Sequence, residues 1–126
     1  MVMKTFILAP FAFILLITTD KCKNKNENSV YKGKLEVKGM CMNYTIKLLE
    51  GNIDTSKLVA EWKNESTGKT HNNVFALGSV CNFPTTINEG DEFSFTIDTS
   101  YVSNCAVCLA YYPKPAKSIA IKVVNK

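Results

Sequence analysis

After residue 29 the chain alternates between apolar and polar residues with a period of two. In residues 30–38 the apolar side chains would share one face, and lysine and glutamate the other, which is typical of a strand with one solvated face. Turn residues separate such segments, for example at residues 50–52 and 88–91. The predicted strands are residues 30–38, 42–49, 58–62, 74–77, 92–97, 104–112 and 117–124.

This pattern predicts an all-β domain with little helix, because no window longer than about ten residues has a helical period. Seven short strands favour a small closed or partly open antiparallel barrel, or alternatively a seven-strand β-sandwich. An immunoglobulin-type sandwich would place a tyrosine two residues before its second cysteine. Tyr101 lies four residues before Cys105, which argues against that type.

Residues 104–112 form the most apolar run of the domain and carry two of the five cysteines. Pro113 and Pro115 end the run, and its valine, leucine and tyrosines favour a strand. We predict a buried strand here, around which the domain is organised. The aromatic residues on alternating strand positions are also predicted to lie in the core: Tyr31, Tyr44, Phe93, Phe95, Tyr111 and Tyr112.

Residues 1–21 have the pattern of an export signal. Lys4 precedes an apolar run over residues 6–17, which is shorter than the roughly 20 residues of a membrane-spanning helix. Residues 22–29 are predicted to form a flexible tether, since all but the first are polar, and residues 30–126 a single β-domain. We therefore expect an exported protein of the periplasm or the outer membrane surface.

Cys22 lies directly after this segment and before the polar tether, as the lipidated cysteine of a bacterial lipoprotein does. It is a candidate for lipidation, which would anchor the protein to a membrane. Lys21 departs from the lipoprotein pattern, which has a small residue before the cysteine. The alternative is cleavage after Thr19, which leaves Cys22 as an ordinary thiol.

The remaining four cysteines are Cys41, Cys81, Cys105 and Cys108, and an even number in an exported domain favours two disulfides. Cys105 and Cys108 would lie about 10 Å apart on a regular strand, too far to bond to each other. Each is therefore expected to bond to either Cys41 or Cys81. Four thiolates around zinc, or a redox-active pair of Cys105 and Cys108, are the alternatives.

Composition excludes several chemistries. All 15 basic residues are lysines, and without arginine the net charge of +4 argues against a nucleic-acid partner. His71 is the only histidine and is predicted to be exposed in a polar loop, so that no histidine-based dyad or metal site is expected. No catalytic residues, metal site or cofactor are predicted.

The layout of residues 31–124 resembles an OB-like barrel: a long first strand with an internal glycine, Gly33, leads a meander, and a Gly90–Asp91–Glu92–Phe93 strand start comes late. With its cysteine placement it also resembles uncharacterised small envelope proteins of the Bacteroidota type, which implies a fold and a compartment. We expect a non-enzymatic cell-envelope module that binds a protein or glycan or is simply structural. The alternative is a thiol–disulfide redox or metal-handling protein.

Overall fold

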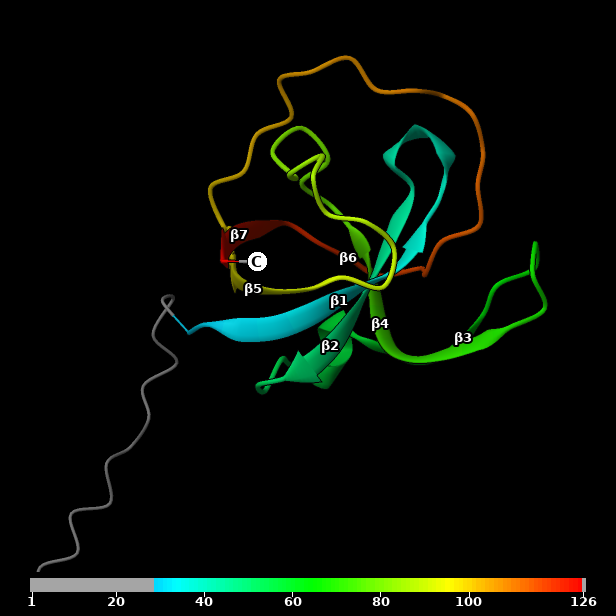
Figure 1. Cartoon of the computed structure of the whole chain (residues 1–126), viewed down its shortest axis with the longest axis horizontal. Helices are drawn as coiled ribbons and strands as arrows, with labels where there is room; N and C mark the ends of the chain where they lie inside the picture. Colours follow the sequence, from blue (N-terminus) through cyan, green and yellow to red (C-terminus); the bar gives the residue numbers. More distant parts are fainter. Residues whose placement is uncertain (1–28, 126) are drawn as a thin grey trace, which may run out of the picture.

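Seven strands form one strongly curled sheet in the computed structural model, which describes residues 29–125 (Figure 1). The order along the sheet is β3-β4-β2-β1-β5-β7, and β6 pairs with β4. Within the described residues only two short 3₁₀ helices interrupt the strands: η1 at Met40–Met42 and η2 at Thr55–Lys57. The strands are β1 Tyr31–Lys38, β2 Tyr44–Glu50, β3 Val59–Lys63, β4 Thr70–Leu77, β5 Glu92–Ile97, β6 Ser118–Ile119 and β7 Ile121–Asn125.

The C-terminal segment brings the two sides of this sheet together. β6 and β7 are separated by Ala120 alone, yet β6 pairs with β4 and β7 pairs with β5. The sheet therefore curls into a partly open barrel, which confirms the predicted all-β barrel. One detail differs from the predicted antiparallel arrangement, because the β4–β6 pair is parallel.

Aromatic side chains fill the barrel. Phe75, Phe93 and Phe95 are almost completely buried, and the ring centroids of Phe93 and Phe95 lie 5.9 Å apart. Burial of each such side chain contributes about 1.5–3 kcal/mol. Gly33 makes room for them, since a Cβ atom there would lie 2.8 Å from Cε1 of Phe95. The predicted core positions Tyr44, Phe93 and Phe95 are confirmed, and Tyr31 packs at the edge of the core.

A serine hydroxyl extends the seam between β4 and the C-terminal segment. The seam begins with backbone hydrogen bonds from Ala76 N to Lys117 O and from Gly78 N to Ile119 O, each 2.8 Å long. Beyond them Ser79 Oγ donates to Ile121 O at 2.7 Å and accepts from Ile121 N at 2.8 Å. Ser79 is completely buried, and its hydroxyl takes the place of a backbone partner for Ile121, the first residue of β7, just beyond the end of β4.

The predicted buried strand at residues 104–112 is wrong. None of these residues belongs to a strand, and residues 102–111 are exposed. The segment cannot join the barrel because β6 and β7 already occupy the space between β4 and β5. Tyr111 is 81% exposed, which also corrects its predicted place in the core, and Tyr112 is only partly buried.

Ser79→Ala tests the seam. Without the hydroxyl, the buried N–H and C=O groups of Ile121 lose their partners, and a buried polar group without a partner costs about 1–3 kcal/mol. We expect urea denaturation to show a loss of unfolding free energy in this range. The control Ser118→Ala removes an exposed hydroxyl and should change stability by less than about 0.5 kcal/mol. Equal stability of the two variants would contradict this role of Ser79.

Candidate functional site: a loop strapped by two disulfides

The candidate site is the long connection between β5 and β6, residues 99–116, which we call the strap. It leaves β5 on one side of the barrel, passes over the loops at one end and descends on the other side to β6 (Figure 1). Its sequence has the composition of a buried strand, but its apolar side chains face solvent. Those exposed are Val102, Val107, Leu109 and Tyr111, with Met40 of η1 nearby in the loop beneath.

Two disulfides hold the strap against two different loops. Cys108 is bonded to Cys41 in η1, and Cys105 is bonded to Cys81 in the loop between β4 and β5. The Cα atoms of the two pairs lie 5.3 and 5.7 Å apart, within the usual range for disulfides. This confirms the two predicted disulfides and resolves the pairing that the sequence left open.

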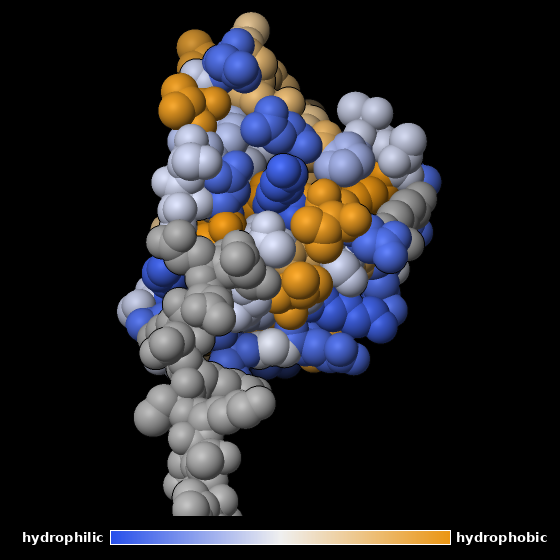
Figure 2. Space-filling model, turned by 90° about the vertical axis from the view of Figure 1, so that its left-hand side faces the viewer, coloured by the Kyte–Doolittle hydropathy of each residue, from blue (hydrophilic) through white to orange (hydrophobic). Residues whose placement is uncertain are grey.

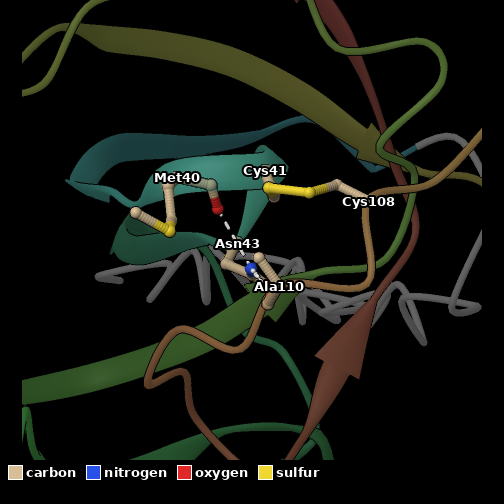
Figure 3. Close-up of a disulfide and its surroundings, with 5 residues drawn as sticks. All are labelled: Met40, Cys41, Asn43, Cys108 and Ala110. Carbon is tan, nitrogen blue, oxygen red and sulfur yellow. Dashed lines mark hydrogen bonds between the residues drawn. A yellow bond between two sulfur atoms is a disulfide. The ribbon is translucent and has the colours of Figure 1, made fainter.

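Polar contacts and close packing add to the covalent attachment. Asn43 Nδ2 donates to Met40 O at 3.0 Å and to Ala110 O at 3.3 Å, which joins η1 to the strap beside the Cys41–Cys108 bond (Figure 3). Tyr112 packs so closely on Gly39 that a Cβ atom there would lie 2.5 Å from the ring. These contacts fix the position of the strap at several points along its length.

The backbone beneath the strap is strained. Cys41 and Met42 have φ angles of 59° and 60°, in the left-handed region that costs roughly 1–2 kcal/mol for each residue other than glycine. Such residues persist only where the surroundings hold them. Here the surroundings include the bond to Cys108 and the hydrogen bond from Asn43 N to Met40 O at 3.2 Å.

A small hollow lies between the two disulfides. Its volume is about 120 Å³, well below the roughly 300–1,000 Å³ of typical small-molecule sites. The walls are sulfur and apolar side chains, from Cys41, Met42, Val80, Cys105, Ala106, Val107 and Cys108. The hollow is therefore too small and too apolar for a typical metabolite, and the outer surface of the strap is the more prominent feature.

His71 departs from its predicted place in an exposed loop. It lies in β4, its side chain is 10% exposed, and its Nδ1 atom is 2.9 Å from Oε1 of Glu36 on β1. The ring of Trp62 covers it, with centroids 5.5 Å apart. The expectation that no histidine-based dyad would form is thus wrong. The contact could not be predicted from the residue pattern, because Asn73, with a left-handed φ of 54°, interrupts β4 between His71 and the apolar half of the strand.

The charge of Glu36 depends on this contact. Burial disfavours the carboxylate, but the hydrogen bond with His71 and the nearby charges of Lys34 and Lys47 outweigh burial and lower the pKa of Glu36 below its usual value of 4.5. Oε2 of Glu36 and Nε2 of His71 are buried without hydrogen-bond partners. Both side chains lie on the outer face of the sheet and are nearly buried there, with the ring of Trp62 over His71, which makes them part of the architecture.

Cys22, the export signal at residues 1–21 and most of the tether at residues 22–29 lie outside the described residues. Lipidation of Cys22 therefore stays a prediction. No helix in residues 29–125 is long and apolar enough to cross a membrane. Within the same residues no group of three or more metal-ligating side chains occurs. The four cysteines Cys41, Cys81, Cys105 and Cys108 all form disulfides.

Removal of each disulfide should destabilise the domain by an amount that depends on the loop it closes. The pairs are separated by 24 and 67 residues, which the chain-entropy model converts to about 3.5 and about 4.4 kcal/mol. We expect both double variants to have a lower unfolding free energy in denaturant titration. The loss should be larger for Cys41→Ser/Cys108→Ser, which opens the longer loop, than for Cys81→Ser/Cys105→Ser. Unchanged stability in both double variants would contradict a stabilising role.

The Glu36–His71 contact predicts a dependence of stability on pH. Because the pKa of Glu36 is lower in the folded than in the unfolded protein, its contribution is present above the unfolded pKa of about 4.5 and is lost as pH falls through the folded pKa. Denaturation midpoints measured from pH 6 to pH 2 should therefore fall more steeply in the wild type than in Glu36→Gln. Glu65→Gln, which changes an exposed carboxylate, is the control and should behave as the wild type does.

The chain matches no protein-family model, and no curated protein or solved structure is significantly similar to it. The function proposed below is therefore inferred from the chain's own residues and their arrangement.

Proposed function

We propose that this protein is an exported, non-enzymatic module of the cell envelope that uses the outer surface of the strap to bind a partner. Two disulfides are consistent with an oxidising compartment outside the cytoplasm. The apolar run at residues 6–17 supports export, and a lipid on Cys22 would keep the domain close to a membrane.

The observation that carries this proposal is an apolar surface that is exposed and held in place. Leu109 is 95% exposed, while its neighbours Cys108 and Ala110 are fixed to η1 (Figure 3). Hydrophobic side chains also gather along the upper edge of the molecule, where Figure 1 places the strap (Figure 2). Exposed apolar patches commonly mark interaction sites, and a rigid loop loses little entropy on binding.

A catalytic function has less support from the acid–base groups. The best-defined pair, Glu36 and His71, lies on the outer face of the sheet, where it is largely buried and His71 is covered by the ring of Trp62. A substrate would have to displace that ring to reach Nε2 of His71, which is buried. The pair therefore fits a structural role better than general acid–base catalysis, which requires a reachable proton.

The thiol–disulfide alternative also has less support. A redox-active C-x-x-C pair forms a bond between its own two cysteines during its cycle, whereas Cys105 and Cys108 are each bonded to a cysteine of a different loop. Neither is at the start of a helix, where a thiolate would be stabilised. The disulfides fit better as fasteners of the strap.

Substitutions on the strap should separate binding from folding. Val107→Ser/Leu109→Ser changes two exposed side chains, so the melting temperature should stay within about 2 °C of the wild type. The measurement is the amount of the protein that can be cross-linked to other envelope components in intact cells of the host. If the strap is the binding surface, this amount should decrease at least fivefold in the variant. The matched control is Val124→Ser, since Val124 is 50% exposed on β7.

Two outcomes would contradict this proposal. One is an unchanged cross-linking pattern in the strap variant. The other is titration of reactive thiols in the native protein without reductant, which would favour the redox alternative.

A further inference from the structure

The second half of the strap contacts the barrel through two side chains four residues apart, although it pairs with no other strand. Cys108 and Tyr112 face the barrel, where they contact Cys41 and Gly39. Between and beside them Val107, Leu109 and Tyr111 are exposed. The backbone has no turn or bend from residue 106 to residue 115, so these three side chains follow one another on one face of an extended segment.

The backbone of this segment has free hydrogen-bonding groups. In the described chain no backbone N–H from Tyr101 to Ala116 donates a hydrogen bond. The carbonyl of Ala110 is used by Asn43 Nδ2, so the edge that carries the polar groups of Ala110 lies beside Asn43. Because successive residues of a strand direct these groups to opposite edges, those of Val107, Leu109 and Tyr111 lie on the other edge, opposite Asn43.

We propose that this free edge pairs with the same edge of a second copy of the chain, as two antiparallel strands related by a two-fold axis at Leu109. The proposal rests on the proposed function of the strap as a binding surface and names its partner. Leu109 would face Leu109 of the other copy, and each Val107 would face a Tyr111. The three pairs would exchange about six backbone hydrogen bonds, and valine opposite tyrosine is a favourable cross-strand pair.

The strap is the part of the surface where a second copy can bind without charge repulsion. The protein has a formal net charge of +4, and the outward face of β1 carries Lys32, Lys34 and Lys38. Two copies that met through such faces would bring lysines together, whereas residues 99–113 contain no charged residue. The strap is thus a strip along which two identical positive domains can approach with little repulsion.

The size of the contact sets the strength that can be measured. Five paired residues bury less than the roughly 1,200–2,000 Å² of a stable interface, so association should be reversible and visible at protein concentrations of about 10–500 μM. Two copies attached to one membrane would be at high local concentration, which would favour the pair.

The test uses the full-length chain with its disulfides intact, studied by sedimentation and by residue-resolved hydrogen exchange at increasing concentration. We expect a monomer–dimer equilibrium in which the amides of Val107, Leu109 and Tyr111 become protected as concentration rises. The amides of Cys108 and Ala110, on the opposite edge, should not change. This alternation distinguishes strand pairing from association through the apolar residues 6–17, which would leave the strap amides unprotected.

A charge on the two-fold axis provides the matched variant. Leu109→Asp places two carboxylates opposite each other, and we expect it to weaken dimerisation at least about tenfold with an unchanged melting temperature. Val124→Asp, at an exposed position of β7, should dimerise as the wild type does. A monomer at all concentrations with unprotected strap amides, or a dimer unaffected by Leu109→Asp, would overturn the proposal.

Failure of self-pairing can be told apart from failure of the proposed function. A monomeric protein whose Val107→Ser/Leu109→Ser variant still loses its envelope association has a strap that binds a different partner. A monomeric protein whose strap variant keeps that association overturns both proposals.

Discussion

The parallel pairing of β6 with β4 is the interaction on which the rest of the structure depends. It places the C-terminal segment between β4 and β5, so that the chain has to travel from the end of β5 across the loops of the barrel before β6 can begin. The strap is the consequence of that route. Ser79 stabilises this arrangement. Just beyond the end of β4, its hydroxyl hydrogen-bonds both the N–H and the C=O group of Ile121.

The strap replaces the usual means of holding a strand with covalent ones. A segment of strand-forming residues normally satisfies its backbone hydrogen bonds by pairing in a sheet. Residues 104–112 have no such place, because β6 and β7 already pair with β4 and β5. Cys105 and Cys108 instead attach it to two separate loops, with Asn43 and Gly39 as further points of contact. Its apolar side chains and its free edge are therefore kept in one conformation and remain exposed, which is the physical basis for the binding role proposed for the strap.

The backbone of η1 is in an unfavourable conformation, which the Cys41–Cys108 disulfide offsets. The left-handed conformations of Cys41 and Met42 are unfavourable in isolation, and they bring Cys41 under Cys108. On the outside of the sheet, a second polar arrangement, Glu36 with His71 beneath Trp62, joins β1 to β4 and the β3 strand. The left-handed backbone at Cys41 and Met42 and the burial of Glu36 are each unfavourable locally. Each is compensated by a contact with a residue far away in the chain.

The sequence by itself determined the all-β class, six of the seven predicted strands close to their observed positions, the core places of Tyr44, Phe93 and Phe95, and the formation of two disulfides. These follow from the alternation of side chains and from the reach of a cysteine pair, which are local properties. Only the tertiary structure decided that residues 104–112 lie outside the barrel and that His71 meets Glu36. Whether a strand-forming segment is buried depends on which sheet edges remain free after the other strands have paired. Because β6 and β7 fill the last space, the most apolar run of the domain is held on the surface.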